Sequence, residues 1–127
     1  MFELTINNEV YQFRFGLGFV REVSKKKHEK NGGGNEVEVG LQYAIADIID
    51  ENPLGLVDIL LLANKTEEKR ITKADLENYI ENCEDLEGLF AELLDFLKSN
   101  NSTKKATVNM IEFAENEKKK AAAKAAE

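Results

Sequence analysis

The 127-residue sequence predicts a mostly helical α+β protein, in which an N-terminal β-hairpin packs on a bundle of about five helices. Three observations favour this class. Apolar and polar residues alternate over the first 15 positions, as they do in strands. From residue 17 onward, apolar residues recur every three or four positions, as they do in helices. The hydrophobic fraction of 43% is sufficient for one core in a chain of this length.

The opening residues are expected to form the hairpin. Asn7-Asn8 fit a two-residue turn, because asparagine tolerates the positive φ angles that such turns need. This turn places Phe2 opposite Phe13 and Leu4 opposite Tyr11, so that the apolar side chains share one face. A lone hairpin is marginally stable, so we expect it to pack on helices or on another subunit. Its open edge makes these four residues candidates for self-association.

Helices are expected over residues 17–30 and 36–51. The first ends in a run of lysines, and cations suit a helix C-terminus. Asn31-Gly32-Gly33-Gly34-Asn35 is expected to stop this helix and form a flexible loop. The second helix has an apolar stripe on one face, formed by Leu41, Ala44, Ile45, Ile48 and Ile49.

A third helix is predicted over residues 54–63, which are apolar on nearly every side. Asn52 fits the N-cap of this helix, and Pro53 fits its first turn. Such a helix lies either at the centre of the core or under a partner that covers it. The second interpretation makes Leu56, Ile59 and Leu60 candidates for partner binding.

Two further helices are predicted after a charged connector. Thr72 and Asp75 fit a capping box that starts the fourth helix. Residues 85–98 form the clearest helix of the sequence, with leucines and phenylalanines at helical spacing on one face. Residues 99–103 are polar and are expected to interrupt the helical segments.

The end of the chain has a different composition. Residues 106–127 begin with a short apolar group and continue as an Ala/Lys-rich segment that has high helix propensity but no apolar stripe. We therefore predict a hairpin-plus-helices domain over residues 1–103 and a loosely attached, partly helical extension over residues 104–127. Within the apolar group, Met110, Ile111 and Phe113 are candidates either for partner binding or for the edge of the core.

Charge and composition argue against several function classes. The net charge is −7, with −10 on residues 1–117 and +3 on residues 118–127. An acidic body disfavours binding to duplex nucleic acid or to an anionic membrane surface. The single cysteine, Cys83, permits no intrachain disulfide, and this suits a reducing cytoplasm. The N-terminus lacks the pattern of a signal peptide, and no apolar run is long enough to span a membrane.

The sequence contains no recognisable catalytic or cofactor motif. Gly16-x-Gly18 lacks the third glycine of a dinucleotide fingerprint, and Gly32–Gly34 lacks the Lys-Ser/Thr of a phosphate loop. His28 has no histidine or cysteine at a ligand spacing, so no metal site is predicted. The many carboxylates are typical of a solvated helix face, part of which is able to dock a basic partner. We expect a non-enzymatic interaction protein with no cofactor.

Three stretches resemble the tail assembly chaperones of long-tailed phages and of prophages in Gram-positive bacteria. They are MFELTINNEVYQFRFGLGFVREV, VGLQYAIADIIDENPLGLVDILLLAN and ITKADLENYIENCEDLEGLFAELLDFLKSN. The resemblance covers about residues 1–113. Its motifs are diffuse, and none of them is a catalytic signature.

The resemblance implies a chaperone that binds the tape measure protein and keeps it soluble while tail tube subunits assemble around it. It also implies homo-oligomers, action in the cytoplasm of the bacterial host, and absence from the mature virion. A head–tail adaptor or another small structural interaction protein of a phage is the alternative. Lys118-Lys119-Lys120 is compatible with an A-rich slippery sequence for the programmed frameshift of this family, or with an ordinary basic tail or cloning remnant.

Overall fold

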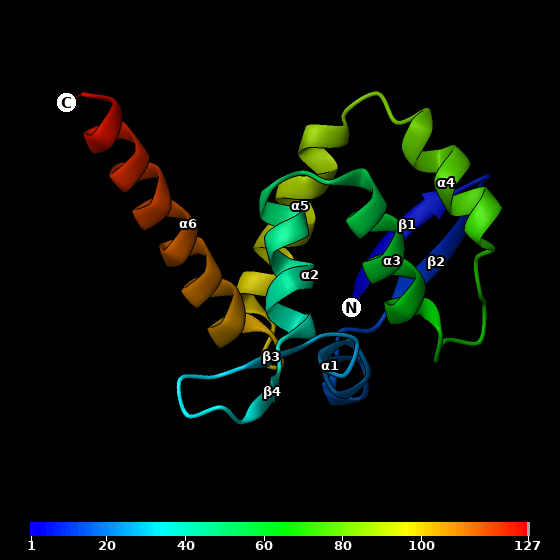
Figure 1. Ribbon diagram of the computed structural model, residues 1–127. Coiled ribbons are helices and arrows are strands. Elements are labelled where there is room, and N and C mark those ends of the chain that lie inside the picture. The colour runs from blue at the N-terminus through cyan, green and yellow to red at the C-terminus, as the bar shows by residue number, and fades with distance from the viewer. Residues whose placement is uncertain (127) are drawn as a thin grey trace.

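The computed structural model describes residues 1–126 and confirms the predicted class, a mostly helical α+β fold that starts with a β-hairpin (Figure 1). Within that range there are six helices and a second small hairpin that was not predicted. In chain order the elements are β1 (Phe2–Ile6), β2 (Glu9–Phe13), α1 (Leu17–Ser24), β3 (His28–Lys30), β4 (Glu36–Glu38), α2 (Gly40–Ile49), α3 (Pro53–Asn64), α4 (Lys73–Glu81), α5 (Leu86–Ser99) and α6 (Lys104–Ala125). Over residues 1–126, no helix combines the length and apolar character needed to cross a membrane.

The first hairpin has the predicted turn and register. Asn7 and Asn8 have φ angles of 53° and 63°, and the pairing places Phe2 opposite Phe13 and Leu4 opposite Tyr11. One face of the hairpin is buried against the helices, where the ring of Phe2 lies 5.6 Å from that of Phe96 in α5. The hairpin is therefore part of the core and depends on the helices for its stability.

The helices predicted over residues 17–30 and 36–51 are both shorter than expected. Residues 28–30 and 36–38 pair as the antiparallel strands β3 and β4, so the prediction of helix there was wrong. Between Val23 and Val37 the chain has no apolar residue to bury against the body, and the lysines at positions 25–27 would repel one another along a helix. The glycine loop closes the hairpin: the Asn31 side chain accepts hydrogen bonds from the N–H groups of Gly33 and Asn35.

Helices α2, α3 and α5 supply most of the core, and two glycines allow the helices to approach closely. A Cβ atom at Gly40 would overlap the carbonyl group of Val23, at the end of α1. A Cβ atom at Gly55 would overlap the side chain of Asp47, on α2. Because neither neighbour is the far end of a flexible side chain, these contacts require glycine. Helix α2 is consequently held between α1 and α3.

The predicted caps of two helices are present. The Asn52 side chain accepts a hydrogen bond from the N–H of Leu54 at the start of α3, where Pro53 is the first helical residue. The Thr72 hydroxyl accepts one from the N–H of Asp75 at the start of α4. These side chains satisfy donors that the first turn of a helix leaves without partners.

A buried asparagine joins three segments of the fold. Asn64, at the end of α3, is 2% exposed. Its Nδ2 donates to the carbonyl oxygens of Gln12 (2.8 Å) and Lys69 (3.0 Å), and its Oδ1 accepts from the N–H of Ile71 (2.8 Å). The amide therefore links α3 to strand β2 and to both ends of the Lys69–Ile71 stretch. Three backbone groups would lose these partners without it.

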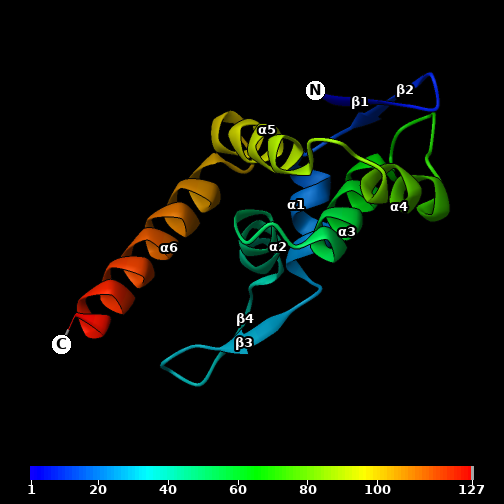
Figure 2. The same ribbon diagram turned by 90° about the horizontal axis from the view of Figure 1, so that it is seen from above.

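Helix α6 begins next to the predicted boundary between residues 103 and 104. Its first turns pack on the body, where Thr107 is fully buried, whereas residues 115–126 are exposed throughout. Figure 2 shows this second half projecting away from the other helices. Residue 127 of the predicted extension lies outside the described residues. The independence of residues 104–127 from the domain remains a prediction.

Gly40→Ala is expected to destabilise the protein by about 1–3 kcal/mol, because the added methyl group meets backbone atoms of α1. Helix propensity alone predicts that the change from glycine to alanine would stabilise the protein. Gly18→Ala in α1 is the matched control: a Cβ atom there meets nothing within 4 Å, so a gain of about 0.5 kcal/mol is expected. Urea unfolding followed by circular dichroism measures both. Equal effects of the two substitutions would contradict the close-packing explanation.

Asn64→Ala is expected to lower the free energy of unfolding by about 2–4 kcal/mol, because it leaves one buried N–H and two part-buried carbonyl groups of the backbone without these partners. Asn82→Ala is the control, since that exposed side chain bonds only to Asn78 within one turn of α4. We expect the control to change stability by less than about 0.5 kcal/mol. Thermal and urea unfolding would refute the role of Asn64 if the two variants were equally stable.

Candidate partner-binding groove

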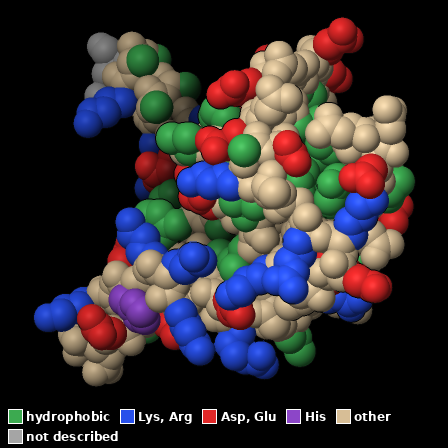
Figure 3. All heavy atoms as spheres, turned by 90° about the vertical axis from the view of Figure 1, so that its right-hand side faces the viewer, with side chains coloured by type: hydrophobic (Ala, Val, Ile, Leu, Met, Phe, Trp, Pro, Cys, Tyr) green, Lys and Arg blue, Asp and Glu red, His purple; other side chains and the backbone are tan. Residues whose placement is uncertain are grey.

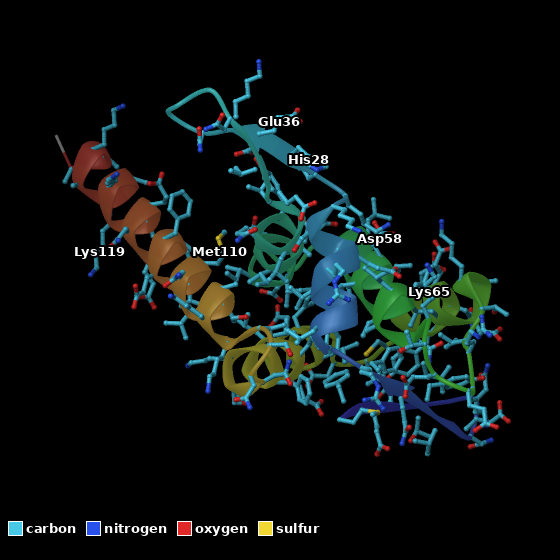
Figure 4. The ribbon with its side chains drawn as sticks, turned by 90° about the horizontal axis from the view of Figure 1, so that it is seen from below. His28, Glu36, Asp58, Lys65, Met110 and Lys119 are labelled. Carbon is cyan, nitrogen blue, oxygen red and sulfur yellow. The ribbon has the colours of Figure 1, made fainter. Side chains whose placement is uncertain are left out.

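An apolar groove separates α6 from α2. Gln42, Tyr43 and Ala46 line it on the side of α2, and Met110 and Phe113 line it on the side of α6. Nearly all of its lining is apolar. Figure 4 shows Met110 pointing from α6 toward α2, and Lys119 pointing away from it. We call this hollow, with its continuation described below, the α2–α6 groove.

The groove continues along the projecting part of α6. In this second part the wall from α2 is formed by Ala46, Ile49 and Asp50, and the wall from α6 extends to Ala121. Polar and charged residues are more frequent here, with Glu117 and Lys118 on α6. The groove thus has an apolar inner part, and its outer part carries charges of both signs.

A polar network fixes the start of α6. The Thr103 hydroxyl donates to the carbonyl oxygen of Leu97 (2.7 Å), and that of Thr107 donates to the carbonyl oxygen of Thr103 (2.8 Å). The Asn100 amide donates to the carbonyl oxygen of Phe15 (2.7 Å), between the first hairpin and α1. Because Thr103 and Thr107 are both buried, these bonds set the direction in which α6 leaves the body.

Tyr43 connects the groove with the second hairpin. Its hydroxyl donates a hydrogen bond to Glu29 on β3, and Lys27 Nζ lies 4.0 Å from the centre of its ring. The hydrogen bond to the Glu29 carboxylate raises the pKa of Tyr43, with smaller contributions from burial and from the negative charge of Glu29. Figure 3 shows the β3–β4 hairpin, marked by His28, and the end of α6 projecting on the same side of the body. The groove is therefore open between two projecting arms.

The predicted partner-binding residues fall into two groups. Met110 and Ile111 are half-buried and Phe113 is 58% exposed, so this group lies at the surface of α6. Leu56, Ile59 and Leu60 are at most 2% exposed, because α3 is surrounded by the other elements. Their side chains already contact the chain's own core. This burial agrees with the interpretation of residues 54–63 as a helix at the centre of the core, rather than one covered by a partner.

The predicted self-association residues have their side chains inside the core. Phe2, Leu4, Tyr11 and Phe13 are each less than 9% exposed. Any pairing of this hairpin with another copy would therefore use its backbone edge. Within residues 1–126, β1 and β2 form a sheet of two strands only.

Sequence reasoning missed the wall of the groove that α2 provides. Tyr43 and Ala46 lie outside the buried stripe of that helix, and Tyr43 is 43% exposed. A large aromatic residue on the polar side of an amphipathic helix was the available signal. The hydrogen bond to Glu29 had no signal in the sequence, because the second hairpin was not predicted.

The single histidine and the single cysteine, the side chains most often used in catalysis or metal binding, lie far apart. His28 lies on β3 and Cys83 lies two residues after the end of α4, and these two elements are well separated in both ribbon views (Figures 1 and 2). Among the residues that the structure describes, no group of three or more His, Cys, Asp or Glu side chains is placed to hold a metal ion.

Residues 3–112 match the family described as phage tail assembly chaperone protein, TAC. The match covers most of the chain and runs from β1 into α6. The chain belongs to the phage tail assembly chaperone family. Comparisons with curated proteins and with solved structures gave no significant match.

Membership of this family agrees with the site. Tail assembly chaperones are non-catalytic proteins that act in the host during assembly, and their partners are tail proteins. The match includes Met110 and Ile111 but ends before Phe113 and the projecting half of α6. The inner α2–α6 groove thus lies mainly within the part of the chain that the family match covers.

Glu29→Gln is expected to lower the pKa of Tyr43 toward that of free tyrosine, about 10, because the charged acceptor is lost. A raised pKa in the folded state means that this contact contributes stability below pH 10, and that the contribution is lost as the pH rises through the folded value. Ultraviolet titration of the tyrosines measures the change. Glu36→Gln on β4 is the control and should leave the titration unaltered.

Proposed function

We propose that this protein binds the tape measure protein of a long-tailed phage or prophage of Gram-positive bacteria. It would keep that chain soluble while tail tube subunits assemble around it, in the cytoplasm of the host, and would be absent from the mature virion. The apolar α2–α6 groove, open between two arms in a protein of this family, is the observation that carries the proposal. A tail tube protein is the second expected partner.

The chemistry of the groove suits an amphipathic helix. Its inner part offers Met110 and Phe113, a flexible thioether and an exposed ring that adapt to different apolar side chains. A long helical partner would expose apolar stripes until the tube encloses it, and several chaperone copies would cover successive stripes. Binding at several places along one chain strengthens the complex without new kinds of contact. The acidic body of each copy would keep the assembly soluble.

Three finer points belong to the same proposal. Copies self-associate, with the edge of the first hairpin as one candidate surface. A longer form of the protein arises by a frameshift at the codons of Lys118-Lys119-Lys120. The proposed partner-binding surface is Met110, Ile111 and Phe113, whereas Leu56, Ile59 and Leu60 are buried in the core and would reach a partner only if α3 became exposed.

Met110→Glu combined with Phe113→Glu is expected to lower the affinity for the tape measure protein about tenfold or more, because a charge would enter an apolar contact. Co-expression with the tape measure protein, followed by measurement of its soluble fraction, tests this. Val108→Glu is the matched control: it adds a charge to the same helix at a position outside the groove lining. Undiminished solubility with the double variant would contradict the proposed site.

A further inference from the structure

A second apolar hollow lies on the other side of α2, and its rim is acidic. Its floor is formed by α2 and α5, with Ile49, Ala91 and Leu94 partly or fully accessible. Glu51, in the turn between α2 and α3, lies on one wall, and Asp85 and Glu87, at the start of α5, lie on the other. We call this hollow the acidic-rimmed cleft.

The acidic side chains of the rim have no basic side chain paired with them in the described part of the chain. Within residues 1–126, no lysine or arginine lies within ion-pair distance of Glu51, Asp85 or Glu87. No basic side chain lines the cleft either. An apolar floor between two acidic walls matches a ligand that has a small apolar face with cations on both sides of it.

The projecting end of α6 has that pattern. On a helix, Lys119 shares one face with Ala122, Ala123 and Ala126, at spacings of three, four and seven. This face is turned away from the chain's own groove, as the direction of Lys119 in Figure 4 shows. Lys118 and Lys120 flank it on the two sides. All side chains of this segment are exposed, and small alanines would allow it to approach the floor of a cleft closely.

We propose that the α6 end of one copy, residues 118–126, binds in the acidic-rimmed cleft of a second copy. Lysines would then face Glu51 on one wall and Glu87 on the other, and the alanine face would cover Ile49 and Leu94. The segment lies beyond the part of the chain that matches the family, which ends at residue 112. This contact names the two surfaces through which copies would self-associate. The inference rests on the proposed function, which includes that self-association.

The contact is of the head-to-tail kind, because two different surfaces meet. A pair of copies joined in this way keeps one free cleft, on one copy, and one free helix end, on the other, so further copies add in the same way until a ring closes or a helical chain grows. Because the attraction is between exposed charges, association is expected to weaken as salt is added.

Two pairs of charge reversals test the contact in the full chain, without any tail protein. One variant carries Lys118→Glu and Lys119→Glu, and the other carries Glu51→Lys and Glu87→Lys. Asp85 is left unchanged because it caps α5. We expect each variant alone to associate about tenfold or more weakly than the wild type in sedimentation equilibrium. An equimolar mixture of the two should associate again, because the reversed end then meets the reversed cleft.

Control variants keep the charge changes but move them elsewhere. Lys104→Glu with Lys105→Glu changes the other end of α6, and Glu68→Lys with Glu81→Lys changes exposed carboxylates outside the cleft. Both should associate as the wild type does. Equal weakening by the controls, or no recovery in the mixture, would overturn the proposal. Wild-type-like association of both test variants would also overturn it, while leaving self-association through another surface, such as the hairpin edge, in place.

A wild-type chain that is monomeric at every concentration would overturn both this contact and the proposed self-association. Binding of the tape measure protein would still stand on its own test, because the double variant in the α2–α6 groove does not alter the cleft. Circular dichroism of each variant shows that the fold and α6 are retained.

Discussion

The architecture depends on one buried side-chain amide. Asn64 is the last residue of α3, and its hydrogen bonds hold β2 and the loop that leads to α4 against the end of that helix. The backbone N–H of Arg14 donates to the carbonyl oxygen of the neighbouring Ala63 and extends the same junction. An apolar residue here would fill the space but would leave the carbonyls and the N–H unsatisfied. The two-stranded sheet, too small to be stable alone, is thereby fastened to the central helix.

Helix α2 borders both of the hollows for which binding is proposed. It is packed against α1, α3, α5 and α6, yet its C-terminal half borders the α2–α6 groove on one side and the acidic-rimmed cleft on the other. Ile49 lines both hollows. A single rigid element therefore separates a surface suited to apolar helices from one suited to basic ones.

Predictions from the sequence succeeded where periodicity and local chemistry agree. The asparagine turn, the caps at Asn52 and Thr72, and the buried faces of α2 and α5 follow from short-range rules. The second hairpin was missed, because a lysine-rich segment with no apolar pattern carries no signal for strands, and its pairing depends on a loop of three glycines. The groove itself was not predicted: Met110 and Phe113 were candidates for partner binding or for the edge of the core, and the opposing wall required the crossing of α2, which no local pattern encodes.

The shape of the protein affects how its size is measured. Helix α6 has 22 residues and is about 33 Å long, and its exposed half extends well beyond a body whose radius of gyration is expected to be about 14 Å for a chain of this length. Such a projection increases friction with the solvent. A single copy of 14.3 kDa will therefore elute from a sizing column ahead of spherical proteins of equal mass. Elution volume alone would overstate the number of copies, and light scattering gives the mass independently of shape.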